Sequence, residues 1–106
     1  MFARIVSMRL KPNTQAEFTQ KVEREILPTL RKQQGFKDEI VFVVPNGTEV
    51  VAISMWDSKD SAETYNRATY PEVQKTLTTL VEGTPEVRTL EVAYSTFHKI
   101  AARVAA

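Results

Sequence analysis

The segment that decides the fold is residues 36–56, FKDEIVFVVPNGTEVVAISMW. Residues 36–44 and 48–56 are rich in β-branched and aromatic side chains, which is typical of β-strands. Between them, Asn46-Gly47 tolerates the positive φ angles of a tight type I′ turn. The segment is therefore predicted to form a β-hairpin whose turn is Pro45-Asn46-Gly47.

Toward the N-terminus, the sequence predicts a strand followed by a helix. Residues 2–10 are mostly apolar, and Lys11-Pro12-Asn13 ends the run. Thr14 and Glu17 have the spacing of a capping box, which opens a helix. Behind them an apolar residue recurs every four positions and predicts one buried helical stripe, made of Phe18, Val22, Ile26 and Leu30.

A proline is expected to interrupt each of two helices. Pro28 lacks the N–H that would bond the carbonyl of Arg24, so the first helix is expected to kink or break there. Gly35 is a natural C-terminal stop for it. After the hairpin, Asp57-Ser58 opens a second helix. Tyr70-Pro71 interrupts that helix, because a residue before proline is pushed out of the α region.

The last part of the chain completes the predicted topology. Residues 82–85 are expected to end the second helix, and residues 86–98 are expected to form the last strand. The order is then β-α-β-β-α-β, and right-handed crossovers place both helices on one face of the sheet. This predicts an α+β, ferredoxin-like fold with a four-stranded antiparallel sheet of order 4-1-3-2. One domain is expected over residues 1–98, followed by a C-terminal tail, residues 99–106.

The strand after the hairpin turn indicates how the second face of the sheet is covered. Two sets of side chains alternate along it, Val51, Ile53 and Met55 on one side and Val50, Ala52, Ser54 and Trp56 on the other. We expect the first set to face the helices, while the side of Trp56 stays open because alternation is least reliable at a strand end. The second set is also largely apolar, whereas a half-solvated strand normally alternates cleanly. We therefore expect a sheet-to-sheet homodimer with C2 symmetry, which closes a dimeric α+β barrel.

Composition argues against several classes of function. The chain has 106 residues, 42% of them hydrophobic and 25% charged, as in ordinary soluble domains, and its net charge of +1 does not indicate nucleic-acid binding. No apolar run approaches the roughly 20 residues that span a bilayer, and the first residues do not resemble a signal peptide, so a cytoplasmic location is expected. Without cysteine there is no thiolate catalysis, and three glycines form no phosphate loop.

Four stretches in order resemble the antibiotic-biosynthesis monooxygenase superfamily of dimeric α+β barrels. They are Leu10-Lys11-Pro12-Asn13, Ile26-Leu27-Pro28, Gln34-Gly35-Phe36, and Val51 to Met55 with Trp56-Asp57-Ser58. The resemblance covers nearly the whole chain. It implies the same barrel fold and a choice among the activities of that family, which include cofactor-free oxygenases and anthrone-type monooxygenases acting on aromatic polyketides, haem-degrading enzymes and quinol oxygenases.

Two aromatic residues follow from this resemblance as candidates. In family members a tryptophan at the position of Trp56 can line the cavity between helices and sheet, but aromatic residues at such a strand–helix corner are more often part of the core. Trp56 is predicted to be largely buried. Tyr65 stands where haem-degrading members carry an iron-ligating histidine, and the first strand lacks their asparagine. We therefore expect no haem degradation and no haem. Tyr65 is otherwise a helix residue that packs on the sheet.

Four further residues could carry chemistry. His98, the only histidine, cannot build a His-rich metal site. It is either solvated or a general base with a pKa of about 6.5. Arg4 could pair with Glu91 across two strands at the rim, or lie in the cavity and bind an enolate, a carboxylate or a developing oxyanion. Tyr70 and Tyr94 could supply hydroxyls to a cavity.

The leading hypothesis is a cofactor-independent monooxygenase-like enzyme for a small aromatic or polyketide-like substrate. Its catalytic candidates are Trp56, Tyr65, His98 and Arg4, and its substrate-binding candidates are Tyr94 and Tyr70. No cofactor, metal, nucleic acid or membrane is expected to take part. The alternative is a non-catalytic small-molecule-binding or dimerisation module of the same fold. A third possibility is an isomerase or lyase, which a buried carboxylate in the pocket would favour.

Overall fold

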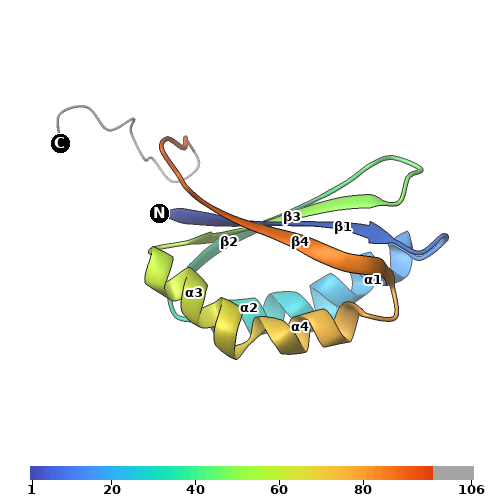
Figure 1. Ribbon diagram of the computed structural model, residues 1–106, viewed down its shortest axis with the longest axis horizontal. Coiled ribbons are helices and arrows are strands. Elements are labelled where there is room, and N and C mark those ends of the chain that lie inside the picture. Colours follow the sequence, from blue (N-terminus) through green and yellow to red (C-terminus); the bar gives the residue numbers. More distant parts are fainter. Residues whose placement is uncertain (97–106) are drawn as a thin grey trace.

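A four-stranded antiparallel sheet with helices on one face makes up the computed structural model, which describes residues 1–96 (Figure 1). In chain order the elements are β1 (Phe2–Leu10), α1 (Gln15–Lys21), the π-helical segment η1 (Val22–Ile26), α2 (Leu27–Arg31), β2 (Phe36–Val43), β3 (Glu49–Trp56), α3 (Lys59–Ala68), α4 (Tyr70–Leu77) and β4 (Val81–Glu91). The sheet order β2-β3-β1-β4 is the predicted one. The ferredoxin-like α+β fold is confirmed. The predicted tail, residues 99–106, lies outside the described residues.

The hairpin forms where it was predicted, but the type I′ turn is wrong. The Gly47 N–H donates to the Val44 carbonyl over 2.9 Å, so the two central residues are Pro45 and Asn46. Proline fixes its φ near −65°, whereas a type I′ turn needs a positive φ at that position. Asn46 alone takes a positive φ, 58°. This is the pattern of a type II turn.

The first helix differs from its prediction at both the cap and the proline. Thr14 is the N-cap, but the capping box does not form: the Thr14 side chain makes no capping hydrogen bond, and its hydroxyl donates to the Lys11 carbonyl over 2.7 Å. The irregularity expected at Pro28 takes the form of η1, a π-helical segment that ends two residues earlier, at Ile26. The wider π turn lies just ahead of a residue that cannot donate to the helix. Gly35, with φ 83°, follows the end of α2.

The last strand begins earlier than predicted and ends sooner. It starts at Val81, so residues 82–85 belong to it and are not a helix stop. The pairing with β1 passes from Ser7↔Glu86 to Arg9↔Glu82, which leaves three residues of β4 opposite Met8 alone. A bulge of this kind accommodates a proline and a glycine on an edge strand.

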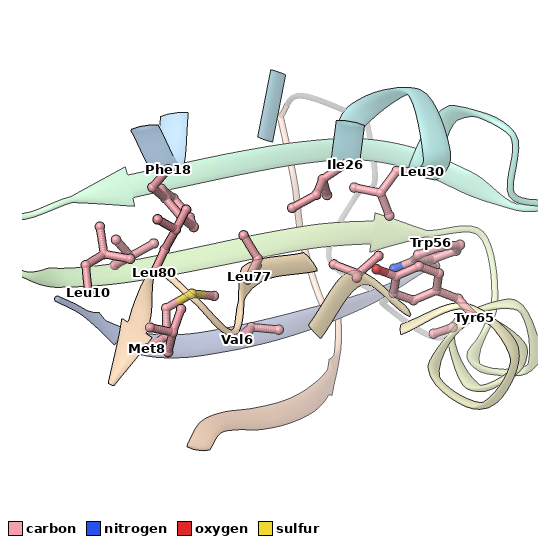
Figure 2. Packing of buried hydrophobic residues seen from close by; sticks show 14 residues of the cluster. Val6, Met8, Leu10, Phe18, Ile26, Leu30, Trp56, Tyr65, Leu77 and Leu80 are labelled. Atoms are coloured by element: carbon pink, nitrogen blue, oxygen red, sulfur yellow. The ribbon is translucent and has the colours of Figure 1, made fainter. Parts of the chain in front are cut away.

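The two sides of β3 are the reverse of the expectation. Trp56 is buried under the helices (Figure 2). Val50, Ala52 and Ser54 lie on the same side, so the alternating residues Val51, Ile53 and Met55 point away from the helices. Six of the seven side chains from Val50 to Trp56 are apolar. Alternation alone therefore could not distinguish the two faces.

Candidate active site

A cavity of about 50 Å³ lies between the sheet and the helix layer. Its polar lining comes from Arg4, Glu39, Ser54, Tyr65 and Tyr70, and its apolar lining from Val6, Met8, Phe18, Val22, Ile26, Leu30, Val41, Ala52, Val73 and Leu77. This volume holds a few water molecules, at about 10–15 Å³ each. A benzene ring occupies cavities of about 150 Å³. An aromatic ligand therefore enters only if some of the lining moves apart.

The floor of the cavity contains a polar row that crosses three strands. Arg4 on β1 lies opposite Ser54 on β3, and Ser54 lies opposite Glu39 on β2. Residues directly opposite one another share a face of the sheet, so these three side chains project toward the helices. The adjacent row of the sheet, Val6, Ala52 and Val41, is apolar. The sheet thus sets charged groups at one side of an otherwise apolar cavity.

Arg4 is buried, with 2% of its surface exposed, so the expected rim position is wrong. The expected Arg4–Glu91 pair is also wrong, because Arg4 lies opposite Thr89 while Glu91 lies opposite Phe2. The pairing register of β1 with β4 decides which residues face each other, and the distance between the two strands along the sequence does not determine that register.

The Arg4 guanidinium is held between polar and aromatic groups. Its Nη2 donates to Asn66 Oδ1 over 2.7 Å. Its Cζ lies 4.0 Å from the ring centre of Tyr70 and 5.2 Å from that of Tyr65. Its Nε is buried without a hydrogen-bond partner. Burial lowers the pKa of Arg4, an effect that Tyr65 and Tyr70 partly oppose.

Glu39 is the functional candidate that sequence reasoning missed. Burial raises its pKa to about 8, against a smaller opposing effect of the Arg4 charge. Within the described part of the chain no salt bridge joins these two residues. The signal was present in the hairpin, which pairs residue 39 with Ser54. To identify Glu39 as a cavity residue, one must also know which face of β3 the helices cover.

Trp56 supports the cavity wall and does not line it. Its exposed fraction is 0%, which confirms the prediction that it is buried. The indole stacks on Tyr65 with ring centres 4.9 Å apart, and its Nε1 donates to Ser54 Oγ over 2.8 Å (Figure 2). Burial raises the pKa of Tyr65 and that of Tyr70. Both phenols therefore stay protonated at neutral pH.

The structure brings three of the six predicted site residues together at the cavity: Arg4, Tyr65 and Tyr70. Trp56 stands behind Tyr65. Tyr94 lies beyond the end of β4, is 62% exposed and is not part of the cavity lining. His98 lies outside the described residues.

A surface groove runs over the cavity, between the first helical stretch and α4. It has a volume of about 140 Å³ and is lined by Glu25, Ile26, Thr29, Glu72, Val73 and Thr76. Ile26 and Val73 also line the cavity below. Two aliphatic side chains thus separate the groove from the cavity. None of the helices that the structure describes combines the length and apolarity needed to cross a membrane.

Comparisons with known proteins give the family. A sequence model of the family described as antibiotic biosynthesis monooxygenase matches residues 1–83. No curated protein matches the chain. The fold is similar to that of a monooxygenase from the gene ActVA-Orf6 of Streptomyces coelicolor in complex with nanaomycin D, at 20% identity and a TM-score of 0.76 over 89% of this chain and 88% of that one.

Two further solved structures have the same fold. SnoaB, a cofactor-independent oxygenase from Streptomyces nogalater, is 15% identical with a TM-score of 0.74, over 90% of this chain and 95% of that one. The NE2512 protein of Nitrosomonas europaea is 14% identical with a TM-score of 0.74, over 90% and 91%. Identities this low show the fold alone, whereas the sequence match covers most of the chain. The chain belongs to the antibiotic biosynthesis monooxygenase family.

Proposed function

We propose that this protein is a cofactor-independent oxygenase for a small aromatic or polyketide-like substrate. The observation that carries the proposal is the Glu39 carboxyl, which lines an otherwise largely apolar cavity and whose pKa burial raises to about 8. A base with a pKa near the working pH is effective in proton transfer. The cofactor-independent oxygenase SnoaB, which shares the fold, supports this choice of reaction.

The proposed reaction begins with removal of a proton from an acidic C–H or O–H group of the substrate. Glu39, in its ionised form, accepts that proton, and the apolar lining excludes water from the resulting carbanion. The carbanion is then oxidised by O2. In the overall change a CH2 group and O2 give a carbonyl and water. One oxygen atom bonds to carbon, and the other leaves as water with both hydrogens. The substrate's own C–H bonds supply the electrons.

Arg4, Tyr65 and Tyr70 complete the proposed site. The two tyrosine rings line the cavity with the aliphatic residues and would give a planar substrate aromatic contacts. Trp56 acts on the site through Tyr65, which it holds by ring stacking.

Oxygen uptake with a hydroxyanthrone as the probe tests the proposal. We expect uptake of one O2 per anthrone oxidised, above the rate of spontaneous oxidation, with formation of the anthraquinone. Glu39→Gln should lower the enzymatic rate by about 100-fold or more, the usual contribution of a general base. Glu23→Gln, an exposed carboxylate on η1, is the control and should leave it unchanged. Uptake at the spontaneous rate with wild-type protein would contradict the proposal.

The same carboxyl also favours an isomerase as the second candidate. A base that removes a proton and returns it to another carbon needs no oxygen, and Glu39 meets that requirement equally well. Under anaerobic conditions in D2O, an isomerase gives a rearranged, deuterated product, whereas an oxygenase gives exchange at the acidic carbon without a new isomer. Binding without exchange or oxygen uptake would favour the non-catalytic binding module instead.

We also infer a homodimer that forms through the sheet face without helices. The argument for a dimer made from the sequence still applies, but the β3 side chains on the face without helices are the other alternating set. Val51, Ile53 and Met55 point away from the helices, and Phe42 and Leu90 are 53% and 42% exposed. Figure 1 shows this face of the sheet without a covering layer. A second copy packed face to face would bury it.

A further inference from the structure

Among the described residues, the charge of Arg4 has no counter-ion within salt-bridge distance. The hydrogen bond from its Nη2 goes to the neutral amide oxygen of Asn66, and its Cζ lies against the rings of Tyr65 and Tyr70, while the charge of Glu39 acts on it from farther away. Glu39 lies in the same row of the sheet, but no salt bridge joins them among the described residues, and burial favours its protonated form. A buried cation without an adjacent anion is costly unless something else compensates it.

Part of the guanidinium is already positioned, and its buried Nε–H has no partner. Asn66 fixes Nη2, and Tyr70 holds one face of the group. The buried Nε makes no hydrogen bond, in a side chain that lines the cavity. A guanidinium donates most strongly to oxyanions and weakly hydrated planar groups. A missing partner of this kind is therefore expected to be an anionic oxygen.

We propose that the cavity binds a planar ring ligand in its ionised form, as a phenolate or enolate whose negative oxygen lies against the guanidinium of Arg4. This deepens the function proposed above and rests on the same cavity. The proton of the ligand leaves to solvent or to Glu39. With the ligand ionised, the charge of the site is balanced, whereas a neutral phenol leaves Arg4 uncompensated. An aromatic carboxylate offers the same oxyanion chemistry from a different source.

The test uses 4-nitrophenol, whose neutral and ionised forms differ in colour, as the probe. The absorbance of the bound probe is titrated against pH, and its dissociation constant is measured at each pH. For wild-type protein we expect the pKa of the bound probe to fall by about one unit, which corresponds to a tenfold preference for the phenolate. In Arg4→Met the bound probe should have a pKa above that of the free probe, because an apolar cavity favours the neutral form.

Two variants guard against an effect on folding. Arg67→Met, an exposed arginine on α3, is the matched control and should preserve the wild-type shift. Arg4→Lys keeps the charge but loses the planar fork, and should retain only part of the preference. The pKa of the probe bound to wild-type protein tests the inference by itself, so the experiment is decisive even if Arg4→Met does not fold. A wild-type protein that binds the neutral phenol in preference, or that binds no probe, would overturn the inference.

A second pair of probes separates the two sources of the oxyanion. Benzoate and benzamide have the same ring but differ in charge, and calorimetry gives their affinities. Benzoate should bind at least tenfold more tightly than benzamide. Equal affinities would overturn the anion site. Benzoate binding more tightly than 4-nitrophenolate would overturn the choice of a phenolate or enolate and assign the site to carboxylates.

Oxygen uptake distinguishes this inference from the proposed function. If Arg4→Met oxidises the hydroxyanthrone at the wild-type rate, the oxygenase stands and the anion site falls. If wild-type protein prefers the phenolate but catalyses no oxygen uptake, the anion site stands and the oxygenase falls.

Discussion

At the scale of single residues, Glu39 is the group in residues 1–96 whose protonation the fold changes most within the ordinary pH range. Burial raises its pKa from 4.5 to about 8, so between these values the folded chain holds a proton that the unfolded chain has released. The folded state then binds more protons, and its stability falls as the pH rises. The stabilisation is fully present below pH 4.5 and is lost as the pH passes 8.

This gives a prediction for Glu39→Gln. The amide cannot ionise, so the decline in the free energy of unfolding between pH 5 and 8.5 should become shallower than in the wild type. Urea unfolding at several pH values measures the slope. Glu23→Gln, which is exposed, should keep the wild-type slope. Equal slopes for wild type and Glu39→Gln would show that Glu39 ionises freely in the fold.

Trp56 gives a prediction about stability. It is fully buried, stacks on Tyr65 and donates to Ser54, so its truncation leaves a large cavity and removes the donor to the Ser54 hydroxyl. Trp56→Ala should lower the free energy of unfolding by about 3–5 kcal/mol. Trp56→Phe, which keeps most of the ring, should cost less. The measurement is the denaturant midpoint, with Tyr94→Ala as the exposed aromatic control. A midpoint unchanged in Trp56→Ala would refute the role in the core.

The sequence identified some site residues by their chemistry but could not give their surroundings. Arg4, Tyr65 and Tyr70 were candidates because charged and phenolic groups are scarce in this chain, and the fold brings them together. Glu39 was not a candidate, because the sequence pattern of its strand indicates only one half of a hairpin. Its position at the cavity depends on which face of β3 the helices cover. Nearly uniform apolar sequence does not encode that choice locally.

At the scale of elements, the helix layer is irregular where it covers the cavity. The π-helical segment η1 supplies Val22 and Ile26 to the lining, and α4, which starts after a break at Thr69, supplies Tyr70 and Val73. Each irregularity lies beside a proline that cannot donate a helical hydrogen bond. These are the places where the two helical stretches can separate most readily.

Ligand entry is predicted to occur through the groove between η1 and α4. Ile26 and Val73 are all that the groove and the cavity share, so reducing one of them should open the way. Val73→Ala should raise the association rate of 4-nitrophenol severalfold, and Val73→Trp should lower it. Thr76→Ala alters the groove without touching the cavity and should have little effect. Stopped-flow absorbance gives the rates. Identical rates in both Val73 variants would place the entrance elsewhere.

Prolines and glycines were reliable as markers of irregularity but not of its kind. Pro28 and Pro71 indicated irregularities in two helices; the first is a π-helical segment in a continuous helical stretch, and the second is a break at Thr69. Gly83 and Pro85 predict the end of a helix, yet they lie in a bulge within β4. A proline is compatible with a turn, a helix start or an edge-strand bulge. Which of these forms is decided by the strand that it pairs with, far away in the sequence.

At the scale of the whole molecule, the face of the sheet opposite the helices is the main unsatisfied surface. Its centre is a row of three isoleucines, Ile40, Ile53 and Ile5, directly opposite one another on β2, β3 and β1. Phe42 and Leu90 extend the apolar surface on either side of that row. A row of β-branched side chains in contact is typical of the interior of packed sheets.

The final prediction is that this face holds two copies of the chain together. A stable interface of this type buries about 2,000 Å² or more in total. In a monomer that surface is exposed to solvent, so the monomer is less stable than the dimer. Sedimentation equilibrium at low micromolar concentration should give twice the mass of one chain. Thermal unfolding should shift to higher temperature as the protein concentration rises, because association stabilises only the folded state.

Ile53→Glu provides the decisive variant, because it places a charge at the centre of the isoleucine row, where burial would cost several kcal/mol. It should give monomers of lowered stability. Gln20→Glu adds the same charge to an exposed position on α1 and should leave the dimer intact. A wild-type chain that sediments as a well-folded monomer, with an unfolding temperature independent of concentration, would overturn the dimer. The cavity lies on the other side of the sheet within one chain, so that result would leave the Arg4 and Glu39 site unaffected.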